Sequence, residues 1–209
     1  MDSVHVVNVV NVVVRTIVGQ FFPFRGLTPD APMPSRDAVE GATASDAVVR
    51  VSASGAPAQH VLALVLAPGG KYMTNSTQLR ELLERAPPGP VTELIVVADD
   101  TFFAKKNMTD VIVTLRAAGT AVSAARFCNF VCDIPAHLSA VPHEIVSPAD
   151  VAAILGRERR KLSDLPRIYL SDPMVVWIGA RAGQVVKITR DSQTAGVAIC
   201  YRLVVAGAL

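Results

Sequence analysis

The chain has 209 residues, of which 51% are hydrophobic and 18% charged, and its formal net charge is +2. It is long enough for one domain or two small ones and apolar enough to bury a core, which excludes a disordered chain. A charge this close to zero argues against a protein that binds nucleic acid alone through a strongly basic surface.

The first element, residues 4–22, can be interpreted in two ways. Its many valines are typical of a buried strand. Its polar residues His5, Asn8, Asn11 and Arg15 recur at steps of three, three and four, which indicates one stripe of a helix. These residues alone leave both interpretations open.

A proline-rich segment, residues 22–45, follows. Its prolines, Pro23, Pro29, Pro32 and Pro34, have no backbone donor, so the segment predicts a loop with one short helix around residues 36–40. A disordered linker is the alternative interpretation.

Two short runs rich in β-formers, residues 47–52 and 60–66, predict two strands of a hairpin or meander. The next segment, residues 75–85, predicts an amphipathic helix, because its leucines fall at positions i, i+3 and i+4. Ser76 or Thr77 is its expected N-cap.

An uninterrupted apolar run, residues 94–98, is typical of a buried central strand with a parallel neighbour. Asp99 and Asp100 follow its C-terminal end, where α/β folds place their chemistry. A metal-dependent nuclease that uses these two carboxylates is therefore one hypothesis. The alternative is a solvated turn that caps the helix predicted for residues 105–118.

Two cysteines and two histidines have the spacing C-x₃-C-x₄-H-x₅-H, formed by Cys128, Cys132, His137 and His143. Four such ligands can hold tetrahedral zinc, but this spacing departs from that of zinc fingers. Reduced cysteines in a packed segment are the alternative, and no metal or other cofactor is expected.

A helix is predicted to begin at Ser147, because Pro148 follows at its first position and Asp150 lies in its first turn. A group of cations ends it: Arg157, Arg159, Arg160 and Lys161. These cations indicate either a patch near nucleic acid or a favourable cation cluster at a helix C-terminus.

The last forty residues predict short elements separated by turns. Asp172-Pro173 forms one turn, and Gly179 and Gly183 bracket a second. Residues 184–190 and 197–205 predict two strands, and the six polar residues between them predict an antiparallel hairpin.

Motifs of nucleophilic, phosphate-binding and zinc-protease sites are missing from the sequence: G-x-S-x-G, Walker A, H-E-x-x-H and G-x-G-x-x-G. Three cysteines fit a reducing compartment better than a disulfide framework. No apolar run reaches the roughly 18–20 residues that span a bilayer, and no signal peptide is evident. An intracellular protein without membrane contact is expected.

The order and spacing of the C-terminal motifs resemble the C-terminal domain of the RNA polymerase subunit RPB5 and the archaeal counterpart of that domain. The matching residues are Leu165-Pro166-Arg167-Ile168, Asp172-Pro173, Gly179, Gly183, Val185-Val186-Lys187-Ile188, Arg190, Ser192, Thr194-Ala195-Gly196 and Tyr201-Arg202. The resemblance is strong over residues 137–205, weaker but collinear over 60–136, and poor over 1–59.

This resemblance implies a fold of two domains. Residues 1–136 would form an α/β N-terminal jaw-like domain, and residues 137–209 a small α+β domain with a mostly antiparallel sheet. It also favours the helical interpretation of residues 4–22, because the family opens with a helix. His137 and His143 match a histidine pair that is structural in the family.

The resemblance further implies a subunit that is not itself an enzyme. It would dock on the largest subunit of a DNA-directed RNA polymerase, contact other subunits and support the jaw near downstream DNA, with direct DNA contact left open. The expected interface residues are Pro166, Arg167, Asp172, Pro173, Gly179, Gly183, Lys187, Arg190, Thr194, Ala195, Gly196, Tyr201 and Arg202.

One departure from the family pattern concerns charge. After Asp172-Pro173 the family has a small residue, then a basic residue and an aromatic one, whereas Val176 stands here in the basic position. This points to a divergent or specialised copy, or a viral one. The implied location is the nucleus, the nucleolus for RNA polymerase I, or the virion or cytoplasm for a viral enzyme.

Overall fold

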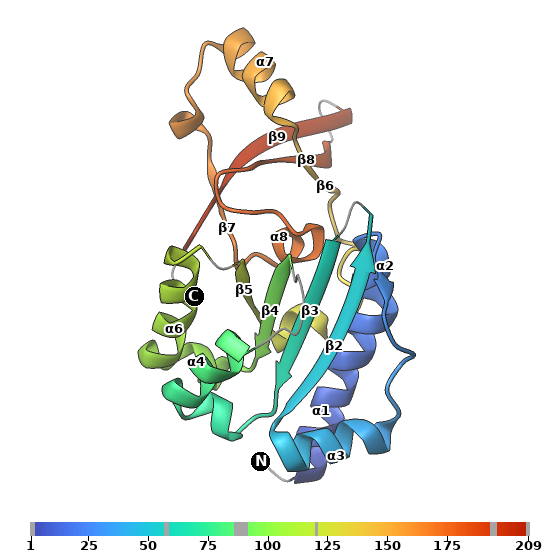
Figure 1. Cartoon of the computed structure of the whole chain (residues 1–209). Coiled ribbons are helices and arrows are strands. Elements are labelled where there is room, and N and C mark those ends of the chain that lie inside the picture. The colour runs from blue at the N-terminus through green and yellow to red at the C-terminus, as the bar shows by residue number, and fades with distance from the viewer. Residues whose placement is uncertain (1–2, 57–58, 86–91, 120, 193–195, 208–209) are drawn as a thin grey trace. The chain divides into compact units, whose positions relative to one another are not determined.

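The computed structural model describes residues 3–56, 59–85, 92–119, 121–192 and 196–207 (Figure 1). The chain divides into two compact units, Met1–Asp133 and Ile134–Ala208. Each unit contains one sheet of mixed direction, so the protein is an α+β protein with two mixed sheets.

The sheet of the N-terminal unit has the order β1-β2-β3-β4-β5. β1 with β2 and β2 with β3 pair antiparallel, whereas β3, β4 and β5 run parallel. The strands are β1 Thr28–Pro29, β2 Val48–Gly55, β3 Gln59–Leu66, β4 Glu93–Ala98 and β5 Val122–Arg126. The predicted hairpin and the predicted buried strand are both confirmed.

Helices lie on both faces of this sheet (Figure 1). They are α1 Ser3–Thr16, the π-helix η1 Ile17–Phe21, α2 Phe22–Phe24, α3 Arg36–Asp46, η2 Lys71–Met73, α4 Ser76–Arg85, α5 Asp100–Phe103, α6 Lys106–Ala117 and η3 Phe127–Phe130. Leu64 and Val96 pack with α4, α5 and α6 in one apolar cluster. The alternate residues Val65 and Val97 are equally buried, which explains the continuous apolar runs of β3 and β4.

The first element is a helix, so the helical interpretation of residues 4–22 is confirmed. Val10, Val13, Val14 and Ile17 are fully buried, while the stripe of polar residues is exposed or partly exposed. Burial at a spacing of three and four residues outweighs the strand preference of valine, because it places one face of the helix in the core.

The helical segment Val4–Phe24, of 21 residues, is long and apolar enough to cross a membrane by length and composition. The expectation that no segment reaches that length is therefore wrong, because it counted uninterrupted apolar residues and a helix tolerates isolated polar ones. Half of the segment's most apolar window is buried within the protein, as in the core helix of a folded domain.

Two further expectations need correction. The helix expected around residues 36–40 extends over Arg36–Asp46, with Ser35 as its N-cap. The helix α4 is capped by the Oδ1 atom of Asn75, which accepts from the N–H groups of Thr77 and Gln78, and not by Ser76 or Thr77.

The sheet of the C-terminal unit has the order β6-β8-β9-β7. Its strands are β6 His143–Ile145, β7 Arg167–Tyr169, β8 Val185–Ser192 and β9 Gly196–Val205; its helices are α7 Pro148–Glu158, η4 Leu162–Asp164 and α8 Pro173–Ile178. β7 runs parallel to β9, because the chain crosses over through α8 and β8 between them. The expectation of a mostly antiparallel sheet is corrected accordingly.

The core of this unit lies between α8 and one face of the sheet. Ile168, Val186 and Val204 from the strands pack with Val175 and Ala180. The opposite face carries the odd-numbered residues of β8 and β9, and α7 contributes no fully buried residue to any core. One side of this small sheet is therefore well packed and the other is open.

Candidate interaction surface

The predicted site residues begin at the start of β7. The N–H group of Leu203 on β9 donates to the carbonyl of Pro166 at 2.8 Å, and Arg167 pairs with Leu203 in the parallel register. The Arg167 side chain is exposed, and its carbonyl accepts a hydrogen bond of 3.3 Å from Nη1 of Arg202. Pro166 and Arg167, at the start of β7, thus lie beside Arg202 of β9.

Asp172 and Pro173 form a helix start rather than a simple turn. The Oδ1 atom of Asp172 accepts from the N–H groups of Met174 at 2.9 Å and Val175 at 3.3 Å, and Pro173 occupies the first turn of α8. The helix ends at Gly179, whose φ of 69° is the left-handed conformation that glycine adopts without strain. These three residues set where α8 begins and ends.

Gly183 also fixes the course of the backbone, just before β8. Its φ is 89°, and its N–H group donates to the carbonyl of Val204 at 2.9 Å. The chain therefore enters β8 in register with β9. Asp172, Pro173, Gly179 and Gly183 position the motif, whereas the charged residues around them are the groups that a partner can contact directly.

Lys187 and Tyr201 face one another across β8 and β9, and Glu144 on β6 is the partner of Lys187 in the next strand. The Nζ atom of Lys187 lies 3.1 Å from Oε2 of Glu144. Glu144, Lys187 and Tyr201 thus form a row across the open face of the sheet. Because Lys187 already has a carboxylate partner and is about one-third exposed, it is a weaker electrostatic anchor than an unpaired cation.

Arg190 and Arg202 belong to the other face, because they alternate with Lys187 and Tyr201 along their strands. The predicted residues that the structure describes therefore lie on both faces of the sheet. Thr194 and Ala195 lie outside the described residues, while Gly196 begins β9 with a φ of 68°.

A groove lies between α7 and the open face of the sheet. Its volume is about 640 Å³, and it is lined by Ala153, Ile154 and Arg157 of α7 and by Lys187, Ile199 and Tyr201 of the sheet, among others. Of these sheet residues, sequence reasoning identified only Lys187 and Tyr201, because a groove between two distant segments has no sequence motif. The apolar run at the start of β9 is the one signal that could have indicated it.

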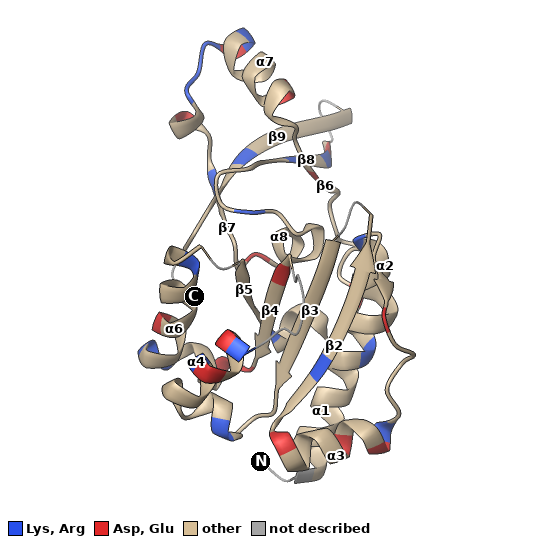
Figure 2. Cartoon of the chain, in the orientation of Figure 1, with Lys and Arg blue, Asp and Glu red and all other residues tan. Residues whose placement is uncertain are grey.

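The basic segment at the end of α7 is exposed. Arg157, Arg159, Arg160 and Lys161 lie in the last turn of the helix and in the segment that follows (Figure 2). Arg159 has a φ of 52° at the C-cap, and the Nη1 atom of Arg160 lies 3.5 Å from Oε2 of Glu158. The predicted helix start is confirmed, since Ser147 Oγ accepts from the N–H group of Asp150.

Asp99 and Asp100 each have a structural partner. The Oδ1 atom of Asp99 accepts from the N–H groups of Thr101 and Phe102 and thereby caps α5, and Asp100 forms an ion pair with Arg126. The predicted turn is found, but it caps this short helix rather than the later α6. These contacts use the carboxylates in the fold and do not favour the nuclease hypothesis.

The histidines of the C-x₃-C-x₄-H-x₅-H pattern contact residues close to them in the sequence. Nδ1 of His137 accepts from the N–H group of Ser139, and Nδ1 of His143 lies 2.7 Å from the carbonyl of Val141. Within the described ranges, no group of three or more His, Cys, Asp or Glu residues is arranged to hold a metal ion.

The sequence of the C-terminal unit is similar to that of known proteins. Residues 132–204 match the family described as RNA polymerase Rpb5, C-terminal domain. A DNA-directed RNA polymerase RPB5 homolog of African swine fever virus (isolate Pig/Kenya/KEN-50/1950) is 36% identical over 149 residues, which cover 69% of this chain and 72% of the viral protein.

An archaeal protein gives a shorter match. The DNA-directed RNA polymerase subunit Rpo5 of Methanocaldococcus jannaschii is 48% identical over 69 residues, which cover 33% of this chain and 88% of the archaeal protein. The sequence of the C-terminal unit is thus similar to both viral and archaeal DNA-directed RNA polymerase subunits. The chain belongs to the RPB5 family of DNA-directed RNA polymerase subunits.

Proposed function

We propose that the chain is a non-catalytic polymerase subunit that docks on the largest subunit through its C-terminal unit. The observation that carries this proposal is the length of the archaeal match. A protein named as a polymerase subunit consists of little more than the 69 matched residues. This supports the C-terminal unit as the part that docks, and the equivalent here is Ile134–Ala208.

The docking surface in this proposal contains the charged and turn residues of the family motif. They are Pro166, Arg167, Asp172, Pro173, Gly179, Gly183, Lys187, Arg190, Thr194, Ala195, Gly196, Tyr201 and Arg202. Arg167 is the most direct candidate, because its side chain is exposed on β7. The glycines and Asp172 contribute by fixing the backbone that presents it.

The position of Val176 distinguishes this chain within the proposal. Val176 lies partly exposed on α8, where the resemblance implies a basic residue. A valine offers no charge to a carboxylate of the largest subunit. Apolar and backbone contacts then provide the binding free energy, as is usual in the centre of protein interfaces.

The N-terminal unit forms the jaw near downstream DNA in this proposal. Residues 1–137 contain eleven Lys and Arg against twelve Asp and Glu, a formal charge of −1. A surface with this charge is more consistent with a jaw that is positioned by neighbouring subunits than with one that binds DNA phosphates electrostatically. The same balance counts against a stand-alone nucleic-acid-binding module.

The location follows the polymerase that contains the subunit: the nucleus for a cellular enzyme, the nucleolus for RNA polymerase I, and the virion or cytoplasm for a viral enzyme. The match to the viral homolog extends over 149 residues, against 69 for the archaeal protein. The archaeal protein is itself little longer than its 69 matched residues, so the lengths of the two matches do not choose between these locations.

A tagged pull-down from the cells or virions that contain the chain tests the proposal. After washing at moderate salt, the two largest RNA polymerase subunits should be recovered with the chain, and mass spectrometry should identify which polymerase they form. Recovery of the chain alone, or with nucleic acid only, would contradict the proposal.

A further inference from the structure

Among the described residues, one edge of β9 is unpaired over most of its length. β9 spans Gly196–Val205 and pairs with β8 throughout, whereas β7 pairs only with its last three residues, from Leu203 to Val205. Pro166 precedes β7 and has no N–H group, so the parallel pairing cannot continue toward Tyr201. The hairpin of β8 and β9 continues beyond both edge strands (Figure 1).

The backbone direction along this edge follows from two hydrogen bonds. The N–H group of Val204 donates to the carbonyl of Gln184 on the β8 side, and that of Leu203 donates to the carbonyl of Pro166 on the β7 side. Because these directions alternate along a strand, Val197 and Ile199 direct their N–H and carbonyl groups outward. No strand in the described ranges pairs with them there.

The side chains on this edge are apolar and exposed. Val197 is 56% and Ile199 53% exposed, and β9 carries no charged residue before Arg202. An unpaired edge with exposed β-branched residues is a template for another strand, and monomeric proteins protect such edges with charges, prolines or bulges. Residues 196–201 contain none of these protections, which indicates that another chain covers them.

The groove beneath α7 adjoins this edge, since Ile199 and Tyr201 of β9 line it together with Ile154 and Arg157. A strand added beside β9 would direct alternate side chains toward the groove. The charged side chains that line the groove balance, with Arg157 and Lys187 against Glu144 and Asp150, while Ala153, Ile154 and Ile199 are apolar. This lining, with the exposed Val197 and Ile199, favours an incoming segment whose side chains are mainly apolar.

We propose that an extended, mainly apolar segment of another polymerase subunit adds as a strand to β9 along residues 196–201. This inference rests on the proposed function and specifies how docking occurs. Backbone hydrogen bonds supply affinity, and the groove selects the alternate side chains.

Hydrogen–deuterium exchange of the full-length chain, free and within the recovered polymerase, tests this strand addition. The outward N–H groups of Val197 and Ile199 should exchange at least tenfold more slowly in the complex. The N–H groups of Ala198 and Cys200 point toward β8, so they should be protected in both states and serve as internal controls.

Two variants test the same edge by binding. Ile199→Pro removes an outward donor but no hydrogen bond to β8, and Val197→Lys places a charge on the edge. Each should weaken retention by the polymerase at least tenfold. Val113→Lys is the matched control, because Val113 on α6 is 52% exposed and lies in the other unit. Circular dichroism establishes whether each variant is folded.

The outcomes separate this inference from the proposed function. A complex that forms while Val197 and Ile199 exchange as fast as in the free chain overturns the strand addition and leaves polymerase assembly intact. A chain that recovers no polymerase overturns both. If light scattering shows that the free chain dimerises and protects the same two amides, a second copy occupies the edge and the inference is also overturned.

Discussion

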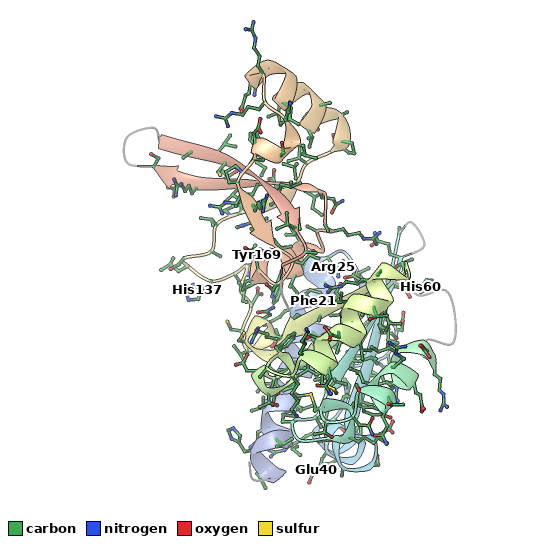
Figure 3. The ribbon with its side chains drawn as sticks, turned by 90° about the vertical axis from the view of Figure 1, so that its left-hand side faces the viewer. Phe21, Arg25, Glu40, His60, His137 and Tyr169 are labelled. Atoms are coloured by element: carbon green, nitrogen blue, oxygen red, sulfur yellow. The ribbon has the colours of Figure 1, made fainter. Side chains whose placement is uncertain are left out.

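Arg25 and Glu93, which are 68 positions apart in the sequence, form an ion pair in which Nη2 lies 2.6 Å from Oε2 and each side chain is 13% exposed. Ser123 donates to the other carboxylate oxygen at 3.0 Å, and the guanidinium of Arg25 lies over the ring of Phe21 (Figure 3). The pair therefore joins the end of the first helical segment to β4 and β5.

Loss of one partner of this pair should destabilise the N-terminal unit. Arg25→Ala leaves the Glu93 carboxylate with little access to water, so it should lower the free energy of unfolding by about 3 kcal/mol. Chemical denaturation followed by circular dichroism measures this change.

The double variant Arg25→Met with Glu93→Leu is the control. It removes both charges and keeps apolar volume, so it should cost less than Arg25→Ala alone. A larger loss in the double variant would show that the pair stabilises the fold beyond the cost of leaving one charge unpaired.

The helix α1 should behave as a core helix. Val13 is fully buried, and Val13→Ala should cost about 2 kcal/mol through lost apolar burial and the cavity that remains. Its neighbour Val12 is 44% exposed, so Val12→Ala should change the stability by less than about 0.5 kcal/mol. Equal effects in thermal unfolding of the two variants would contradict this packing.

Much of the fold is predictable where apolar and polar residues repeat with a clear period in the sequence. The buried runs of β3 and β4 and the polar stripe of α1 are visible because burial repeats with the period of each element. The capped start of α7 is equally visible. By contrast, Asp172-Pro173 has the same cap chemistry but precedes a helix of only six residues, too short to show a period.

The site is less predictable for a physical reason. The motif locates Arg167, Lys187 and Arg202 in the sequence, but the side of the sheet that each occupies depends on the register of β7, β8 and β9. β7 pairs with β9 although the two strands are far apart in the sequence. The groove under α7 forms only when both α7 and the sheet have folded. Local patterns therefore identify the residues but not the surface they form.

Acid should weaken the N-terminal unit through Asp46. The hydrogen bond from Arg50 holds the pKa of Asp46 below its ordinary value. A carboxyl group with a lowered pKa stabilises the fold above its unfolded pKa of about 3.9, and this contribution is lost as the pH falls through the folded pKa. The effect should be on the order of 0.5 kcal/mol, because the pair is exposed.

Comparison with Asp46→Asn isolates this contribution. The wild-type chain should unfold at a higher denaturant concentration than the variant at about pH 6, and the difference should disappear at a pH well below about 3.9. A difference that persists at the lowest pH would assign the effect to the shape of the side chain and not to its charge.

Arg167 offers the most specific test of the docking surface, because its side chain is exposed and its loss should not affect folding. Arg167→Ala should leave the free energy of unfolding within about 0.5 kcal/mol of the wild-type value while weakening retention by the polymerase about tenfold. The tagged pull-down at moderate salt measures retention, and chemical denaturation measures stability.

The control for Arg167→Ala is Arg80→Ala, since Arg80 is an exposed arginine on α4 of the other unit. Combining Arg167→Ala with Gly196→Val adds strain at a φ of 68° and should weaken assembly further, because a valine side chain is disfavoured in the left-handed region. If this double variant were retained as tightly as Arg80→Ala, neither Arg167 nor Gly196 would belong to the docking surface.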